Sequence, residues 1–478
     1  MDSQRSDLRL ANMQRIENAS AVASSRSKRS SLQSLLEYAL FRLVETALRL
    51  LPATWVDILG EGLGTCAYYL MPARRATVRR NCRIAWGESM NEVGLDQLTR
   101  DTFRHCGANL LSSTQCMLMS DEKVKDHVTL EGVEIVRETL QRTNSGAILA
   151  LCHMGNWEIL SRIGTLIAPG IPTAAFYRPL NNPWMNRMTM RRRRRSGTRL
   201  FSNKEGFNQA APLLRSGGML GILADQHAGR SGSLTPFFGR PTSCSPLVEL
   251  LHRRTGAAVF YLAVKRVHRA HWHISIKAHP PETNVTTDAV MHGLEDALST
   301  SPCDGFWFHD RWKMPNKRPF STRQSRQSHS QSRITKPWRF VIISSSQPKI
   351  AAAARPAIEY LIHQLPHAEF EIINLTPALV MPHARFHTIA ANHDWANELK
   401  RIDESKSYPL DLVVYFCDRD EITDAHKKVF IPQAIGLSSG GNRLLDINIP
   451  APLASLTDPQ TWWHFLRALG CVLPDSPP

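Results

Sequence analysis

The sequence predicts an α/β protein made of two units, and three observations support this fold class. Residues 35–117 carry leucine-rich runs at helical spacing. Short apolar runs of strand length then alternate with amphipathic helical runs as far as residue 317, which is typical of a sheet layered with helices. A Ser/Gln/Arg-rich stretch follows, and a second strand-helix alternation begins after it. Because 478 residues are too many for one hydrophobic core, we expect a larger and a smaller unit.

The expected elements follow the chain in order. A disordered polar tail of residues 1–30 precedes the larger domain, residues 31–320. Its candidate strands are residues 147–152, 173–177, 219–223, 257–264 and 272–276, with helices at residues 207–215 and 247–254. Residues 321–336 are expected to form a flexible linker. The smaller unit, residues 337–478, should begin with a strand at 339–344, a helix at 351–364 and a strand at 411–416.

Composition and charge narrow the compartment and the partners. Nine cysteines occur without a Cys-x-x-Cys pair, which argues against a disulfide framework or a cysteine zinc site and favours a reducing compartment. The formal net charge is +16, whereas from Lys336 onward there are 13 basic and 15 acidic residues. The positive excess therefore belongs to the larger domain. It suits an anionic partner, such as nucleic acid, a membrane surface or an acidic carrier protein.

The segment at residues 35–51 (LLEYALFRLVETALRLL) predicts an amphipathic helix with a wide apolar side. Its four charged residues fall within an arc of roughly 140° at helical spacing: Glu37, Arg42, Glu45 and Arg49. The apolar side could pack against the core or enter a bilayer interface. Four arginines in residues 73–81 favour the membrane through anionic headgroups. No stretch is apolar for the ~20 residues that a spanning helix needs, and residues 1–30 lack the apolar middle of a signal peptide.

The strongest local chemical signal is a histidine and a glutamate at the end of an apolar strand. In residues 147–160 (AILALCHMGNWEIL) the strand runs into His153, a Gly-Asn turn follows, and Glu158 stands in the first helical turn. A carboxylate bonded to one imidazole nitrogen would fix the tautomer and leave the other nitrogen to remove a proton from a hydroxyl. The same spacing also fits a core histidine and a glutamate that merely stabilises a helix N-terminus.

Further motifs follow in a fixed order. Tyr177-Arg178-Pro179 precedes Asn181-Asn182, and Ala224-Asp225-Gln226 precedes Gly229, Arg230, Gly232 and Phe237-Phe238-Gly239. Residues 306–313 read FWFHDRWK. With His153-x-x-x-x-Glu158, this series resembles the HxxxxE, YRPxxN, DQ with FFG, and WxHRRWK motifs of the late acyltransferases of lipid A biosynthesis, the lauroyl and myristoyl transferases. The resemblance covers residues 35–319, and Asp310 departs from it where a basic residue is usual.

The resemblance implies a glycerophosphate-acyltransferase-like mixed sheet flanked by helices, and an O-acyltransferase that works without a metal or cofactor. The acyl donor would be an acyl carrier protein thioester, and the acceptor a hydroxyl of a lipid A precursor at the cytoplasmic face of the bacterial inner membrane. It implies His153 as general base with Glu158 as its orienting partner, and catalytic roles for an arginine, matched to Arg193 in the run 191–195, and for Asp225. Substrate contacts would come from Asn156, Tyr177, Arg178, Arg191, Arg192, Gln226, Arg230, Phe237 and Phe238.

Some of these residues have other interpretations. Asp225 follows an apolar strand, where side chains face ligand crevices, but it could instead pair with Arg178 or Arg193. Phe237 and Phe238 could line an acyl chain or belong to the core. At the level of the whole protein, acylation of another lipid-linked sugar, such as a mannosylated inositol lipid, and a catalytically inactive scaffold stay open. A nucleic-acid-binding protein is disfavoured because the arginines are not interleaved with stacking aromatic residues.

The smaller unit faintly resembles the N-terminal half of heptosyltransferase-type glycosyltransferases, which implies a Rossmann-like fold. Gln347-Pro348 stand where that family carries Gly-Asp, and no nucleotide-sugar-binding second half follows within the chain. We therefore expect a degenerate docking or scaffolding unit. On this interpretation, deletion of residues 321–478 should leave acyl transfer measurable.

Overall fold

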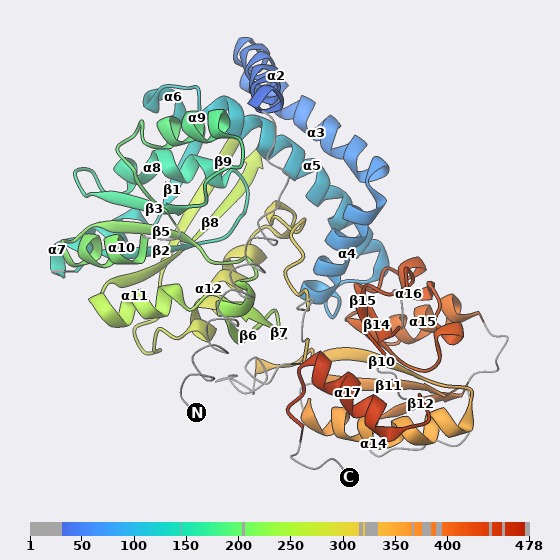
Figure 1. The fold of residues 1–478 in the computed structure, drawn as a ribbon. Helices are drawn as coiled ribbons and strands as arrows, with labels where there is room; N and C mark the ends of the chain where they lie inside the picture. Colours follow the sequence, from blue (N-terminus) through green and yellow to red (C-terminus); the bar gives the residue numbers. More distant parts are fainter. Residues whose placement is uncertain are drawn as a thin grey trace, which may run out of the picture.

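The computed structural model describes residues 31–143, 145–202, 206–314, 319–320, 333–365, 368–374, 384–388, 394–438, 442–451 and 455–473. The expected polar tail and residues 321–332 of the expected linker lie outside these ranges. The described chain forms two large sheets that share no strand, one within residues 128–278 and one within residues 338–449 (Figure 1). The predicted fold class is confirmed: a mixed sheet flanked by helices, followed by a smaller α/β unit. We call residues 31–320 the N-terminal domain and residues 337–478 the C-terminal unit.

The first part of the N-terminal domain is helical, as its periodicity predicted. It consists of α2 (Ser31–Leu50), α3 (Ala53–Leu70), α4 (Pro72–Trp86) and α5 (Glu92–Cys116), which lie along one side of the first sheet and reach the C-terminal unit (Figure 1). α3 packs tightly against α5 because glycines meet there. A Cβ on Gly60 would lie 2.6 Å from the Cα of Ala108, and one on Gly107 would lie 2.2 Å from the Gly60 carbonyl oxygen. Neither position has room for a side chain.

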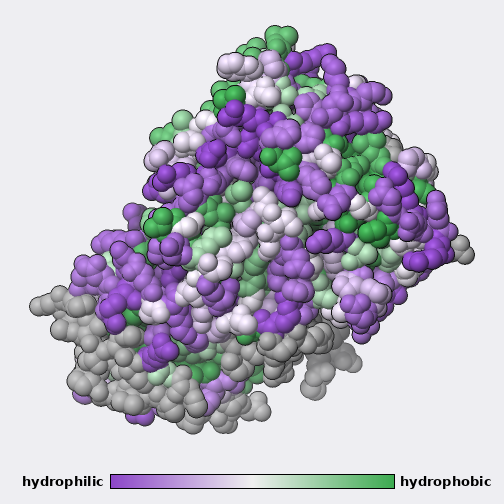
Figure 2. Space-filling view, turned by 180° about the vertical axis from the view of Figure 1, so that it is seen from behind, coloured by the Kyte–Doolittle hydropathy of each residue, from purple (hydrophilic) through white to green (hydrophobic). Residues whose placement is uncertain are grey.

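α2 buries Glu45 and Leu48 and leaves most of its leucines exposed. The buried Glu45 forms ion pairs with Arg42 and with Arg192 of α9 (Pro183–Arg193). Five leucines are between 62% and 81% exposed: Leu32, Leu36, Leu40, Leu43 and Leu50. Green, hydrophobic atoms accordingly mark the upper tip of the molecule in Figure 2, where α2 lies in Figure 1. The interpretation in which this apolar side packs against the core is therefore wrong. Among the described helices, none is both long and apolar enough to cross a membrane.

The arginines of α4 are mostly engaged inside the protein. Arg79 forms ion pairs with two acidic residues of α5, and Arg80 pairs with Asp411 of the C-terminal unit. Arg75 lies over an aromatic ring of α3. Three of the four arginines in residues 73–81 thus have partners within the chain. The expectation that this stretch meets anionic headgroups loses most of its support.

The first sheet places the ends of its central strands at one edge. Its order is β1-β9-β8-β2-β5-β3-β4; β8, β2, β5, β3 and β4 are parallel, and β9 is antiparallel to β8 and parallel to β1. The strands are β1 (Val128–Glu131), β2 (Ala147–Leu151), β3 (Thr173–Tyr177), β4 (Arg199–Ser202), β5 (Met219–Leu223), β8 (Ala258–His268) and β9 (His271–Ala278). The helices around them include α7 (Val133–Arg142), α8 (Leu160–Ile167), α10 (Gly206–Arg215), α11 (Leu247–Thr255) and α12 (Thr287–Ser299). All five predicted strands and both predicted helices are confirmed, whereas the four-residue β1 and β4 were missed.

A separate hairpin of β6 (Ser233–Phe237) and β7 (Arg240–Cys244) lies between the first sheet and the C-terminal unit. Phe238 and Gly239 form its two-residue turn, both with positive φ, at 51° and 75°. Such a turn matches the twist of paired strands. Leu234 of β6 belongs to the apolar core of the C-terminal unit, so the hairpin joins the two parts.

The second sheet is entirely parallel, with the order β12-β11-β10-β13-β14-β15. Its strands are β10 (Trp338–Ser344), β11 (Ala368–Asn374), β12 (Arg385–Thr388), β13 (Leu412–Phe416), β14 (Gln433–Leu437) and β15 (Ile447–Ile449). One face packs on α14 (Pro348–Gln364) and α17 (Pro459–Leu469), the other on α15 (Trp395–Glu404) and α16 (Ala425–Lys428). This is the doubly wound order, in which ligands bind where the strand order reverses, here between β10 and β13.

Candidate active site

An imidazole and a carboxylate meet at the edge of the first sheet. His153 follows β2 and Asp225 follows β5, and because these strands are parallel neighbours their carboxyl ends lie side by side. The Asp225 Oδ1 lies 2.7 Å from His153 Nδ1, and Oδ2 accepts a hydrogen bond from the His153 backbone N–H at 2.9 Å. The expectation that Glu158 orients the imidazole is wrong for this structure, because Asp225 holds Nδ1. Nor does Asp225 pair with Arg178 or Arg193, as the alternative interpretation had it.

The electrostatics of the His153–Asp225 pair favour uptake of a proton by the imidazole. Burial opposes a charged imidazole, but the Asp225 carboxylate outweighs it and raises the pKa of His153 above its ordinary value. Burial likewise opposes ionisation of Asp225, yet His153 and the nearby Arg311 lower the pKa of its carboxyl. The ionised carboxylate accepts a hydrogen bond from Nδ1–H, which keeps the proton on Nδ1 and leaves Nε2 as the basic nitrogen. The side-chain amide of Gln226 lies 3.3 Å from that Nε2.

The turn after His153 requires glycine. Gly155 has φ +55°, and a Cβ there would lie 2.2 Å from the carbonyl oxygen of Val264. The turn is fastened to a second segment: the Phe306 N–H donates to the His153 carbonyl oxygen at 2.8 Å, and the Gly155 N–H donates to that of Asp304 at 2.9 Å. The backbone of His153 is therefore fixed on both sides.

Glu158 lies in a short 3₁₀ turn, η1 (Trp157–Ile159), and pairs with the last residue of α9. The Arg193 guanidinium meets it as a fork, with Nε 3.0 Å from Oε2 and Nη2 bonded to Oε1. Each side chain of the pair is about one quarter exposed. Of the five consecutive arginines, Arg193 is the one that pairs with Glu158, while Arg192 and Arg193 both line the larger cavity beside it. Arg192 pairs with Glu45 instead, and the remaining three are exposed.

The other predicted substrate contacts are distributed around this centre. Asn156 is buried beside the turn, Tyr177 ends β3 half-buried, and Arg178 and Gln226 are exposed. Phe237 is buried in the main core with Phe238 packed against it, which favours their structural interpretation. The Arg230 side chain lies outside the described part of the structure.

Two apolar cavities adjoin the Glu158–Arg193 pair. One has a volume of about 230 Å³ and lies between α2, α5 and α9, with Phe41, Leu110 and Met188 among its lining residues. The other, of about 100 Å³, is enclosed by α8 and the strands β2, β3, β4, β5 and β8. Trp157, Glu158 and Arg193 line both. The Trp157 ring also contacts the His153 ring, with centroids 5.4 Å apart, and so connects the imidazole with both cavities.

A small cluster near the turn has the residue types of a metal site. Ligand atoms of His105, Cys303 and Asp304 lie within 4.8 Å of one another. Both Asp304 oxygens are already engaged: Oδ1 bonds to His105 and Asn109, and Oδ2 accepts from Ser301 and from a backbone N–H. These contacts account for the cluster as a hydrogen-bonded anchor of the segment beside His153.

The family of bacterial lipid A biosynthesis acyltransferases matches residues 26–314. The chain belongs to this family. The match contains His153, Glu158, Arg193 and Asp225, and it makes the N-terminal domain the candidate for acyltransferase activity. No curated protein matches the chain closely enough to add a specific activity.

The C-terminal unit lies beyond the family match, and side chains of the unit itself occupy its crevice. Between β10 and β13, the Glu421 carboxylate accepts hydrogen bonds from the Ser345 hydroxyl at 2.7 Å, the Ser346 N–H at 2.6 Å and the Asp418 N–H at 2.9 Å. Burial works against the charge, but the hydrogen bonds from Ser346 and Ser345 outweigh it and lower the pKa of Glu421. In nucleotide-binding proteins of this strand order a phosphate binds at the corresponding loop, and here the Glu421 carboxylate binds there instead.

Proposed function

We propose that this protein transfers a fatty acyl chain from an acyl carrier protein thioester to a hydroxyl of a lipid A precursor. The observation that carries the proposal is the His153–Asp225 pair, in which Nε2 is the basic nitrogen and the imidazole contacts Trp157, a lining residue of both apolar cavities, in an acyltransferase family member. A His–carboxylate pair of this kind is a general base for a hydroxyl nucleophile.

In this mechanism Nε2 of His153 removes the proton of the acceptor hydroxyl as its oxygen attacks the thioester carbonyl. The C–O bond forms, the negative charge moves to the carbonyl oxygen, and the tetrahedral intermediate collapses as the C–S bond breaks. The imidazolium returns its proton to the leaving thiolate. Asp225 keeps the imidazole in position and stabilises its charged form while this happens.

Arg193 supplies a positive group at the same place. Glu158 engages its Nε and Nη2, and in the described part of the chain its Nη1 takes part in no hydrogen bond. A guanidinium oriented in this way suits a phosphate of either substrate or the oxyanion of the intermediate. The two apolar cavities that flank it suit the acyl chains of the two substrates.

We further propose that α2 and α3 place the protein on the membrane. Both helices carry exposed apolar residues, and Phe41 of α2 lines the larger cavity; the exposed residues are Leu32, Leu36, Leu40, Leu43, Trp55, Leu59 and Leu63. An apolar helix face with no partner in the fold gains free energy by entering a bilayer interface. An acyl-bearing acceptor could then pass from the bilayer to the cavity without crossing water.

The membrane proposal is tested with the double variant Leu36→Asp/Leu40→Asp. Both leucines are exposed, so the fold should persist, while two charges on the apolar face should lower binding to phospholipid vesicles about tenfold or more. Val267→Asp, at an exposed apolar residue of β8, is the matched control and should bind like wild type. Equal vesicle binding by all three proteins in a sedimentation assay would contradict the proposal.

The activity itself is tested with the full chain, lauroyl or myristoyl acyl carrier protein, and an acylated glucosamine disaccharide in mixed micelles. Mass spectrometry should find acceptor heavier by one acyl group. If the disaccharide is unchanged while another glycolipid in a parallel reaction gains the acyl group, the acceptor class is wrong. If no acceptor gains mass, the enzymatic proposal fails.

A further inference from the structure

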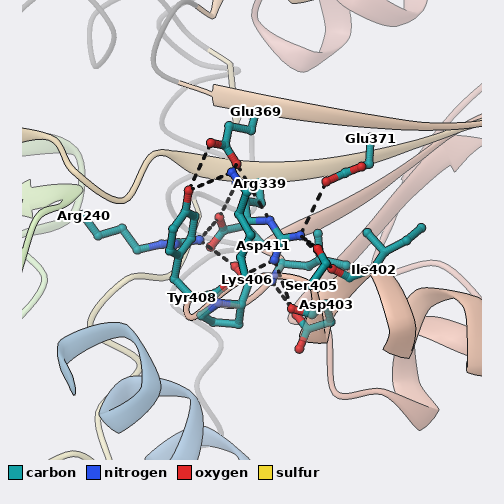
Figure 3. Close-up of polar contacts among 12 residues, drawn as sticks. Arg240, Arg339, Glu369, Glu371, Ile402, Asp403, Ser405, Lys406, Tyr408 and Asp411 are labelled. Atoms are coloured by element: carbon teal, nitrogen blue, oxygen red, sulfur yellow. Dashed lines mark hydrogen bonds and ion pairs between the residues drawn. The ribbon is translucent and has the colours of Figure 1, made fainter. Parts of the chain in front are cut away.

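A buried aspartate of the C-terminal unit binds two arginines of the N-terminal domain. Asp411, just before β13, is 1% exposed; its Oδ1 accepts from Arg80 of α4 at 2.6 Å, and its Oδ2 pairs with Arg240 of β7. Oδ2 also accepts the backbone N–H of Arg339 at 2.9 Å. Figure 3 shows Arg240 reaching in from one side and meeting Asp411 beside Arg339 and Tyr408.

The buried positive charge of Arg240 is compensated by the Asp411 carboxylate. Arg240 is fully buried, and burial lowers the pKa of its guanidinium to about 10 even though Asp411 opposes the effect. Arg240 donates further to the Pro409 carbonyl oxygen at 3.0 Å and lies over the Tyr408 ring. Removing the carboxylate would leave Arg240 and Arg80 as uncompensated buried charges, which proteins tolerate poorly. Arg240 is therefore held in place by the C-terminal unit.

The same strand, β7, holds an arginine of the active-site region. Arg311 donates to the Thr242 hydroxyl, the Ser243 carbonyl oxygen and the Cys244 sulfur, each at 3.0 Å. The Arg311 carbonyl oxygen in turn accepts from the Thr242 hydroxyl at 2.8 Å. Arg240 begins β7 and these three residues complete it, so one short strand spans the distance from Asp411 to Arg311.

β7 also holds the loop that starts at Asp225. The Ser243 carbonyl oxygen accepts from the Ala228 N–H at 3.1 Å, and its hydroxyl donates to the Gly229 carbonyl oxygen at 2.6 Å. Asp225 and Arg311 line one small cavity together, and the charge of Arg311 helps to lower the pKa of the Asp225 carboxyl. The position of β7 therefore sets both the backbone and the charge around the partner of His153.

We infer that the C-terminal unit is a positioning part of the acyltransferase, in which Asp411 fixes β7 through Arg240 and β7 holds the Asp225 loop and Arg311 in place. Asp411 and Arg240 are positioning residues, remote from the reacting atoms. The inference rests on the proposed function for its kinetic consequence. On this inference the deletion of residues 321–478, which was expected to leave acyl transfer measurable, should lower it because Asp411 is removed.

The interface offers a matched comparison. Arg83 of α4 is another buried arginine that crosses it: it pairs with Asp403 and donates to the carbonyl oxygens of Asp403 and Lys406 at 2.7 and 2.6 Å. These contacts join α4 to the C-terminal unit and do not involve β7. Replacement of either Arg83 or Arg240 should loosen the interface in general. Only replacement of Arg240 should displace the Asp225 loop and Arg311.

The experiment compares full-length Arg240→Met, Asp411→Asn and Arg83→Met by hydrogen exchange and by steady-state kinetics. Arg240→Met and Asp411→Asn should speed exchange in peptides that cover residues 226–232 and 240–244, and should lower kcat about 10- to 100-fold with KM within about twofold. Arg83→Met should lower the melting temperature but leave that exchange and kcat near wild type. Arg240→Met keeps Asp411 paired with Arg80, so it stays informative if Asp411→Asn fails to fold.

Two results would overturn the inference: unchanged exchange in both peptides of Arg240→Met, or equal effects of Arg83→Met and Arg240→Met on exchange and kcat. Failure of the proposed function is recognised separately, because wild type would then be inactive in the same assay. The exchange measurement still decides whether β7 depends on Asp411.

Discussion

The polar groups at the carboxyl edges of the two sheets differ in whether they can still accept a proton. In the first sheet, Asp225 satisfies one nitrogen of His153 and leaves the other as a base next to two cavities. In the second, Glu421 is bound by two backbone N–H groups and a serine hydroxyl in the crevice between β10 and β13. The first edge therefore has a nitrogen that can accept a proton, whereas the carboxylate at the second edge already accepts hydrogen bonds from groups of the same unit.

This difference teaches that strand order alone does not identify a functional site. Both sheets bring loops together where parallel strands end, which is where α/β proteins bind ligands. The group that remains able to accept a proton, with a perturbed pKa and a cavity beside it, distinguishes the first edge. The hydrogen bonds at the second edge stabilise the C-terminal unit. We infer that this unit affects the first edge through Asp411, which positions β7.

The largest effect should come from the first edge. His153→Ala removes the base that Asp225 holds, so acyl transfer should fall about 10³-fold or more while far-ultraviolet circular dichroism stays like wild type. His268→Ala, at an exposed histidine of β8, is the control and should retain activity. Substantial turnover by His153→Ala would exclude the first edge as the catalytic centre.

Asp225→Asn should have the next largest effect, together with a defined pH signature. Burial favours the neutral imidazole, and without the carboxylate that opposes it the pKa of His153 should fall. Since the base acts in its neutral form, the acidic limb of the kcat/KM profile should move to lower pH, while the plateau drops about 100-fold because the tautomer is no longer fixed. An acidic limb that stays in place would mean that another group controls it.

Variants of the Glu158–Arg193 pair test the contribution of the region beside the cavities separately from that of the base His153. Arg193→Met should lower kcat/KM about 10- to 100-fold through lost binding of anionic groups, and Glu158→Gln should lower it less because the guanidinium remains. Arg194→Met, at the exposed neighbouring arginine, tests whether mere positive charge matters and should be close to wild type. Equal losses in Arg193→Met and Arg194→Met would point to general attraction of anions.

The second edge should give the smallest effect on catalysis. Glu421→Gln weakens the hydrogen bonds of the crevice and should lower the melting temperature, but acyl transfer should remain within about twofold of wild type. A calorimetric melt and the acyl transfer assay check the two expectations. A large loss of kcat in a folded Glu421→Gln protein would erase the contrast between the edges.

The sequence predicts the elements better than their contacts. Apolar runs of strand length located β2, β3 and β5, and in β2 burial of every residue accounts for the continuous hydrophobic signal. The partner of His153 was missed because Glu158 is near in sequence, whereas Asp225 comes from a strand whose adjacency depends on the order of the sheet. Both residues follow apolar strands, and a parallel pairing of those strands was the signal that could have joined them.

Two further features depended on long-range packing. The five arginines after residue 190 look alike in sequence, and only the place where α9 ends selects Arg193 for the site. The amphipathic pattern of α2 predicts a helix with two faces, but Arg192 is what draws Glu45 and its face inward. Burial of Glu45 with its ion pair, together with Leu48, sets the orientation of that helix, while most of its leucines stay exposed.

The imidazole of His153 tests the central claim most directly. Nitrogen-15 NMR of histidine-labelled protein, with the His153 signal assigned from its loss in His153→Gln, reports both the tautomer and the titration. We expect a neutral form protonated at Nδ1, a pKa above the ordinary histidine value, and a lower pKa in Asp225→Asn. A neutral form protonated at Nε2, or a pKa that does not change in Asp225→Asn, would contradict the account.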